Sequence, residues 1–248
     1  MSRTPVKSSS EPDVAAPRDR AILRVQRAAP RPPRRGGETR TVVSFSLEPG
    51  DAHVLAGEAG SGKTALLEMI GLARPPACGG VELFGLDLGR IEPRDRYRLR
   101  RRLGFIFQNP RLIEDLSARD NVALAAEAAG RRPADYASHV EELLAWVGLG
   151  RKAGQMAGGL DEEGRRRLAV ARAVINRPDL LIADEPGLEN GMVILKLLAD
   201  LNQAGTTLLM ATQDLDLAAR SGAEVTFLTR TTAARPGSGE PVAETRAP

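Results

Sequence analysis

The sequence has little cysteine, no long apolar run and few histidines, and each of these shortages excludes a class of protein or site. It has one cysteine, Cys78, so no internal disulfide forms, and this fits a reducing compartment. It has no apolar run near the ~20 residues that a membrane-spanning helix needs, and no apolar signal core near residue 1. Its two histidines, His53 and His139, lack the neighbouring ligands of a metal site. We therefore expect a soluble, cytoplasmic protein that reaches any membrane through a partner or a tail.

The net charge of the chain is also small. It is formally +3 over 248 residues, which gives no reason to expect a nucleic-acid partner. With 42% hydrophobic and 27% charged residues the composition is globular. This length is enough for one core, or for one core with a small lobe.

A glycine-rich stretch in the first third of the chain carries the strongest motif. It matches the phosphate-loop pattern G-x-x-x-x-G-K-[ST] at every required position. An apolar, strand-like run over residues 52–56 precedes it, and a helix-like run with one apolar face follows over residues 64–70. The predicted phosphate-binding residues are Gly57, Glu58, Ala59, Gly60, Ser61, Gly62, Lys63 and Thr64.

This motif predicts binding of a polyphosphate together with Mg²⁺. Glycines let successive backbone N–H groups converge on phosphate oxygens, and the N-terminus of the following helix favours negative charge. Lys63 would contact the β- and γ-phosphates, and the Thr64 hydroxyl would bind Mg²⁺. The alternative is a strand-to-helix turn that binds nothing. The lysine, the threonine and both flanking segments favour the phosphate site.

The rest of the chain alternates between strand-like and helix-like segments. The predicted strands cover residues 21–25, 41–47, 52–56, 81–84, 103–107, 180–184, 207–212 and 224–229. Helices are expected over residues 64–70, 94–102 and 194–201, and a helical lobe over residues 117–176. This alternation indicates a parallel α/β sheet. Residues 1–20 and 231–248 are rich in proline and in small or charged residues, so we expect disordered tails there.

Two carboxylates follow the uninterrupted apolar run of residues 180–183. Asp184 and Glu185 would lie at the carboxyl end of a strand buried on both faces, which is where ligands bind in open α/β sheets. Asp184 would hold Mg²⁺, directly or through water, and Glu185 would polarise an attacking water. Alone this pattern is weak evidence, but together with the phosphate loop it indicates a site for nucleotide hydrolysis.

These motifs resemble those of the ATP-binding subunits of ABC systems, over roughly residues 21–230. Residues 105–108 are similar to the family's Q-loop, residues 167–173 to the helix after its signature sequence, and residues 180–186 to its Walker B strand. The resemblance implies a P-loop NTPase core with a parallel sheet, an antiparallel β edge and a helical lobe at about residues 109–176. It also implies ATP and Mg²⁺ as ligands, with Gln108 sensing Mg²⁺ and the γ-phosphate.

Within the family, residues 120–124, 171–178 and 208–212 are most similar to the cell-division ATPases of the FtsE type. This similarity implies an FtsX-like integral membrane protein as partner, a homodimer of the ATP-binding subunit, and a peripheral position on the cytoplasmic face of the inner membrane. Docking is expected on the surface from Gln108 to Asn121. Two alternatives stay open. One is the ATPase of a lipoprotein-release or macrolide-export transporter, and the other is a nucleotide-responsive scaffold without hydrolysis.

Several positions depart from the family pattern, and together they predict weak hydrolysis. The L-S-G-G-[QE] signature acts on the ATP of the neighbouring subunit, and it would fall at residues 160–164. There Asp161, Glu162 and Glu163 would oppose the γ-phosphate. Like charges at ~4 Å repel by about 4 kcal/mol at an effective dielectric near 20. A shifted register over residues 156–160 would keep a glycine pair. Gln213 replaces the switch histidine, and it can hydrogen-bond a phosphate but cannot carry a positive charge.

Two further elements differ from the family. The D-loop is shortened at residues 187–190, and no aromatic residue for stacking on adenine is present at residues 26–30. The catalytic roles would therefore fall to Glu185, Gln108 and Gln213. Outside the site, Trp146 lies on a predicted apolar helix and is expected to pack in the protein core, and Cys78 is expected in a loop.

Overall fold

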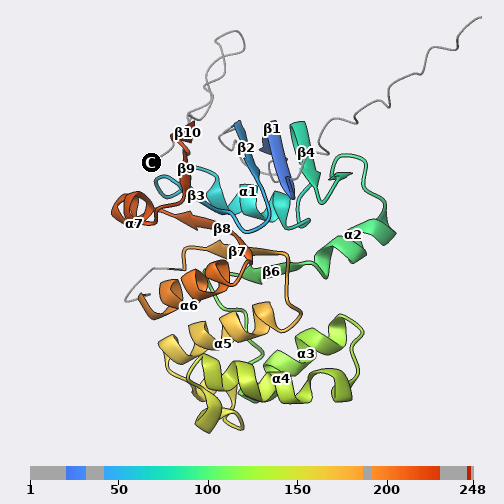
Figure 1. The fold of residues 1–248 in the computed structure, drawn as a ribbon, viewed down its shortest axis with the longest axis vertical. Helices are drawn as coiled ribbons and strands as arrows, with labels where there is room; N and C mark the ends of the chain where they lie inside the picture. Colours follow the sequence, from blue (N-terminus) through green and yellow to red (C-terminus); the bar gives the residue numbers. More distant parts are fainter. Residues whose placement is uncertain (1–20, 32–41, 187–191, 230–244, 247–248) are drawn as a thin grey trace, which may run out of the picture.

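The structure, a computed structural model, describes residues 21–31, 42–186, 192–229 and 245–246 (Figure 1). The predicted tails, apart from residues 245–246, and the shortened D-loop at residues 187–190 lie outside the described residues. The strands are β1 (Leu23–Pro30), β2 (Val43–Leu47), β3 (Ala52–Ala56), β4 (Pro76–Leu83), β5 (Leu86–Asp87), β6 (Leu103–Ile106), β7 (Leu180–Asp184), β8 (Thr207–Thr212), β9 (Glu224–Phe227) and β10 (Thr245–Arg246).

The helices alternate with these strands along much of the chain. They are α1 (Lys63–Ile70), α2 (Pro93–Arg100), α3 (Ala118–Ala128), α4 (Pro133–Trp146), α5 (Glu162–Val174), α6 (Met192–Gln203) and α7 (Leu215–Arg220), with short 3-10 turns η1 (Gly150–Lys152) and η2 (Ala157–Gly159). Each predicted strand is present, although β1 ends at Pro30 rather than at residue 25. Strands β5 and β10 and helix α7 were not predicted from the sequence.

The strands form two sheets. Six strands in the order β10-β9-β3-β8-β7-β6 make one sheet, in which every pair from β9 to β6 is parallel. Four strands in the order β2-β1-β4-β5 make a second, antiparallel sheet. Figure 1 shows α3, α4 and α5 gathered in a lobe below the six-stranded sheet. This arrangement confirms the predicted α/β fold with a parallel sheet, an antiparallel part and a helical lobe.

The central strands have a buried side chain at every position because both of their faces are covered. On one face Leu55, Ile182 and Leu209 pack with α1 and with strands of the antiparallel sheet. On the other face Val54 and Leu181 pack with residues of α5, α6 and the helical lobe. The parallel sheet is therefore the middle layer of the molecule, and its carboxyl edge is held in place from both sides.

The helical lobe buries one stripe of α4, and Trp146 lies outside that stripe. The buried positions Tyr136, Val140, Leu143 and Leu144 follow the spacing of one helix face. Trp146 is 38% exposed, so the prediction that it belongs to the core is wrong. Cys78 was also misplaced, because it lies within β4, where its side chain is exposed.

No helix in the described ranges is both long enough and apolar enough to cross a membrane.

His53 is a buried histidine in β3, with only 1% of its surface exposed. Its ring stacks on Phe45 at a centroid distance of 4.6 Å, and its Nε2 lies 2.9 Å from the Thr226 hydroxyl. Burial lowers the pKa of His53 from 6.5 to about 4. Glu224 does not reverse this shift, because its carboxylate is about half-exposed and lies 3.6 Å from Nδ1, beyond hydrogen-bond distance.

The pKa of His53 predicts a loss of stability in acid. Since the folded state has the lower pKa, the unfolded state binds the proton first, and stability falls as the pH drops from about 6.5 towards 4. The contribution lost by pH 4.5 is about 2.5 kcal/mol. Urea unfolding at pH 7 and pH 4.5 should show this loss for the wild type relative to His53→Gln, which cannot titrate. A difference between the two proteins that does not change with pH would contradict the prediction.

Candidate nucleotide-binding site

The phosphate loop connects β3 to α1 and can only be built with glycine at several positions. Gly60 and Gly62 have φ angles of 79° and 98°, in the left-handed region that side chains disfavour. A Cβ atom on Gly57 would lie 2.4 Å from the carbonyl oxygen of Leu228. Gly62 also forms the N-cap of α1 without a side-chain hydrogen bond. The first amides of α1 are therefore open to an anion, as at other helix N-termini.

Lys63 is the first residue of α1, and its ammonium group is buried in the loop. The residue is 5% exposed. Its Nζ donates to the carbonyl oxygens of Gly57 at 2.7 Å and Glu58 at 3.1 Å, and it lies 3.3 Å from Glu185 Oε1. The fold thus brings the predicted phosphate-binding lysine against the predicted hydrolytic carboxylate, although the two are 122 positions apart in the sequence.

Glu185 directly follows β7 and is held by the end of β8. Its backbone N–H donates to Ala211 at 2.9 Å, and its Oε2 accepts a hydrogen bond of 2.9 Å from the backbone N–H of Gln213. Its φ of 49° is in the left-handed region, which costs a non-glycine residue about 1 kcal/mol or more. Gln213 therefore acts on Glu185 through its backbone, while its own side chain is exposed.

Asp184, the last residue of β7, fits the predicted Mg²⁺ ligand. It is 4% exposed, and its Oδ1 has no hydrogen-bond partner among the described residues. Burial raises the pKa of Asp184, whereas a hydrogen bond with the Thr64 side chain lowers it. A buried carboxylate oxygen beside a threonine hydroxyl suits a hard cation. The described ranges hold no cluster of three His, Cys, Asp or Glu residues, so most ligands would have to come from phosphate and water.

Gln108 follows β6, the neighbour of β7 on the side away from β8, and lies in the same region. It lines a narrow crevice together with Glu185 and Pro186, and with Arg166 and Ala169 of α5. The parallel pairing of β6 with β7 explains this meeting, because the carboxyl ends of neighbouring parallel strands lie side by side. The fold therefore brings Lys63, Asp184, Glu185, Gln108 and Gln213 to one edge of the sheet. Glu58, Ala59 and Gly60 form the exposed part of the loop, and Ser61 is buried beneath it.

The three carboxylates at the predicted signature position lie at the start of α5 and do not contact these residues. Asp161 is the N-cap, and its Oδ1 accepts from the backbone N–H of Gly164 at 2.8 Å. Glu162 pairs with Arg166 at 2.5 Å, and Glu163 pairs with Arg167. Lys152 Nζ lies 3.9 Å from Asp161. The glycine pair of the alternative register lies one element earlier, in η2.

The expected docking surface needs one correction. Asn121 is only 1% exposed and binds backbone groups, so it belongs to the interior rather than to a surface. Arg111 and Arg119 are exposed; the Arg111 guanidinium lies over the Phe107 ring, and Arg119 pairs with Glu141. Sequence reasoning also missed a role for Arg172, whose type and position gave no sign of the backbone groups that it binds.

The sequence and fold of this chain are similar to those of known proteins. The family model described as ABC transporter matches residues 41–187. The cell-division ATP-binding protein FtsE of Escherichia coli (strain K12) is 39% identical over 72% of this chain and 82% of its own length. The macrolide export ATP-binding/permease protein MacB of Neisseria meningitidis serogroup B is 34% identical over 72% of this chain, which spans only 29% of that relative.

A solved dimeric ATP-binding cassette, bound to ADP and phosphate after hydrolysis, has the same fold with a TM-score of 0.74 and 26% identity, covering 84% of this chain and 95% of its own. The fold and the site thus define a P-loop nucleotide-binding protein. This chain belongs to the ABC transporter family, as an ATP-binding subunit. Members of this family bind ATP, normally with Mg²⁺.

The buried position of Lys63 predicts a large effect of its removal. Lys63→Ala should lower ATP affinity at least about tenfold, because a charge-assisted phosphate contact is worth about 1.5–3 kcal/mol. Binding of a labelled, non-hydrolysable ATP analogue measures the change. Lys196→Ala, which removes an exposed lysine of α6, is the matched control and should bind as the wild type does. Equal affinity of Lys63→Ala and wild type would rule out the phosphate site.

Proposed function

We propose that this protein is an FtsE-like ATP-binding subunit that partners an FtsX-like membrane protein in bacterial cell division. The observation that carries the nucleotide part of this proposal is the contact of buried Lys63 with Glu185 beside Asp184. The cell-division part rests on the 39% identity with FtsE, compared with 34% for MacB. In this reading the protein is peripheral on the cytoplasmic face of the inner membrane and works as a homodimer. Its ATP-binding domain covers residues 21–230, with the helical lobe at about residues 109–176.

Each residue at the sheet edge would have its own role in nucleotide binding and hydrolysis. Lys63 and the amides at the start of α1 would hold the β- and γ-phosphates. Asp184, Thr64 and Gln108 would hold Mg²⁺, which neutralises phosphate charge. Glu185 is placed by the backbone of Gln213 and would orient the attacking water as a general base.

Hydrolysis is slow in this proposal because of the residues that flank the site. The carboxylates at the start of α5 would face the γ-phosphate of the other subunit in an ABC-type homodimer. Their ion pairs with Arg166 and Arg167 offset part of the repulsion. Exposed i,i+4 pairs contribute only about 0.3–0.5 kcal/mol, less than the ~4 kcal/mol repulsion of two like charges at 4 Å. Gln213 cannot supply the charge of a histidine. Nucleotide occupancy, rather than fast turnover, would carry the signal.

Two other functions are supported by specific observations. Identity of 34% with MacB supports a transport ATPase of the macrolide-export or lipoprotein-release kind. The carboxylates at the start of α5 support a nucleotide-responsive scaffold that does not hydrolyse ATP. Co-purification from membranes separates the first two, because the recovered membrane protein is either FtsX-like or a transporter permease. A measurement of ATP hydrolysis by the purified protein distinguishes the scaffold, which does not hydrolyse ATP, from the two ATPases.

Repair of the departing positions should raise the ATPase rate. The repaired variant carries Gln213→His with Asp161→Ser, Glu162→Gly and Glu163→Gly. We expect it to hydrolyse ATP about tenfold faster than wild type or more, equivalent to at least ~1.4 kcal/mol of the barrier. Steady-state phosphate release, with and without the membrane partner, measures the rate. Glu185→Gln, introduced into both the wild type and the repaired variant, gives the background rate of phosphate release without the general base. If wild type is as fast as the repaired variant, slow turnover is not a property of these residues.

Reversal of one charge near the predicted docking surface should weaken partner binding. Arg119→Glu puts a negative charge beside Glu141, so recovery of the FtsX-like protein from membranes should fall several-fold while ATP affinity stays unchanged. The double variant Arg119→Glu with Glu141→Arg keeps the ion pair but exchanges the positions of the two charges. It therefore tests whether partner binding needs the ion pair or the positive charge at position 119. Arg220→Glu on α7 is the control. Unchanged recovery with Arg119→Glu would exclude this surface.

A further inference from the structure

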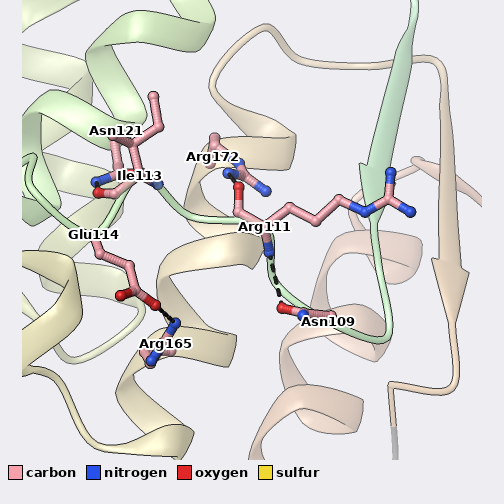
Figure 2. A network of polar contacts seen from close by, with 7 residues as sticks. All are labelled: Asn109, Arg111, Ile113, Glu114, Asn121, Arg165 and Arg172. Carbon is pink, nitrogen blue, oxygen red and sulfur yellow. Dashed lines mark hydrogen bonds and ion pairs between the residues drawn. The ribbon is translucent and has the colours of Figure 1, made fainter.

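The segment of residues 107–117, which joins β6 to α3, contains little regular structure, yet side chains hold its backbone along its length. We call it the linking segment. Figure 2 shows its contacts with Asn121 of α3 and with Arg165 and Arg172 of α5. Gln108 is the second residue of this segment and lies two residues after β6, so the contacts that hold the segment help to position Gln108.

Asn121 holds the second half of the linking segment. Its Oδ1 accepts a hydrogen bond from the backbone N–H of Ile113 at 2.9 Å. Its Nδ2 lies within donating distance of the carbonyl oxygens of Ile113 at 3.0 Å and Ser117 at 3.0 Å. Because the side chain is buried, no water competes for these bonds. This half is therefore fixed to α3.

Arg172 holds the first half, close to Gln108. Its guanidinium donates to the carbonyl oxygen of Arg111 at 2.7 Å and to that of Pro110 at 2.5 Å. Burial lowers the pKa of Arg172, because it removes the guanidinium from water. Arg111 has a φ of 49°, a conformation disfavoured for arginine, and the two charge-assisted bonds beside it offset that strain.

Helix α5 contacts the linking segment at two points along its length. Arg172 lies near its C-terminal end, and Arg165 near its N-terminal end pairs with Glu114 at 2.5 Å. The helix also packs directly on β6, because a Cβ on Gly104 would lie 2.7 Å from the carbonyl oxygen of Ala173. The helix that carries the acidic residues Asp161, Glu162 and Glu163 at its start thus binds the linking segment at Glu114 and, two residues after Gln108, at Pro110.

We propose that Arg172 is a positioning residue for Gln108: it holds the linking segment so that Gln108 faces Glu185 across their crevice. This inference rests on the proposed function, in which Gln108 contacts Mg²⁺ and the γ-phosphate. Arg172 itself acts through Pro110 and Arg111 rather than on the nucleotide. The consequence is that loss of Arg172 should mimic loss of Gln108.

The test is a double-mutant cycle with Arg172→Met, which keeps a long apolar stem and removes the donors. Affinities for a non-hydrolysable ATP analogue and for ADP are measured with Mg²⁺ and with EDTA. Arg172→Met and Gln108→Ala should each weaken Mg²⁺-dependent ATP binding about fivefold to tenfold, with little change for ADP or in EDTA. The double variant should be no weaker than Gln108→Ala alone. Arg172→Lys, which retains the charge and one donor group, should bind between wild type and Arg172→Met.

Arg131→Met is the matched control, because Arg131 also donates to a backbone carbonyl in the lobe, that of Ile175 at 2.8 Å. Thermal unfolding reports whether each variant folds. If Arg172→Met does not fold, the same cycle with Arg172→Lys should show an effect of about threefold that Gln108→Ala abolishes. Wild-type affinity in the Arg172 variants, additive effects in the cycle, or an equal loss in Arg131→Met would each overturn the inference.

The Lys63→Ala variant separates failure of this inference from failure of the proposed function. If Lys63→Ala loses ATP binding while the Arg172 variants bind as wild type does, the positioning role is wrong and the nucleotide site remains. If Lys63→Ala, Gln108→Ala and the Arg172 variants all bind ATP as the wild type does, both the proposed function and the inference are overturned.

Discussion

The buried ammonium group of Lys63 is the constraint on which the site depends. A charge almost removed from water must be met by partners, and here these are two loop carbonyls and Glu185. Glu185 is in turn held by the backbone of Gln213 after β8. One charge therefore links the phosphate loop with the ends of β7 and β8. In the proposed function, a polyphosphate would compete with these acceptors for the same ammonium group and would make the edge of the sheet responsive to nucleotide.

This edge stays in place because the sheet behind it is packed on both faces. The α1 side of β3, β7 and β8 contributes to one core, and the opposite side contributes to another that extends into the helical lobe. Close packing gives the strand ends little freedom to move separately. Any nucleotide-dependent change would therefore be accommodated more easily in the irregular linking segment and in the lobe that it joins than within the sheet.

The carboxylates at the start of α5 stabilise this helix but are unfavourable for binding a phosphate at the same place. Asp161 is a good N-cap, and Glu162 and Glu163 suit the positive end of the helix dipole as well as their i,i+4 arginines. These residues therefore stabilise the N-terminus of α5. In the proposed homodimer the same charges would oppose the γ-phosphate of the other subunit, and the repulsion would exceed the ion-pair energies wherever water is excluded. The sequence has a stable α5 at a position where ABC-type subunits use a serine and glycines.

The sequence by itself determined the phosphate loop, the buried strand that precedes Glu185, and the order of the strands and helices other than β5, β10 and α7. It could do so because glycine spacing, apolar runs and breaks between them act over a few neighbouring residues. The sequence also indicated Gln213, since a substitution at an expected position is visible without a structure. It failed for Trp146, because the buried face of α4 is decided by what packs on it. It could not reveal that Lys63 meets Glu185 or that the backbone of Gln213 holds that carboxylate. Nor could it show that Asn121 and Arg172 hold the linking segment. Those contacts join residues 4 to 122 positions apart, and only the packing of strands and helices brings the distant ones together.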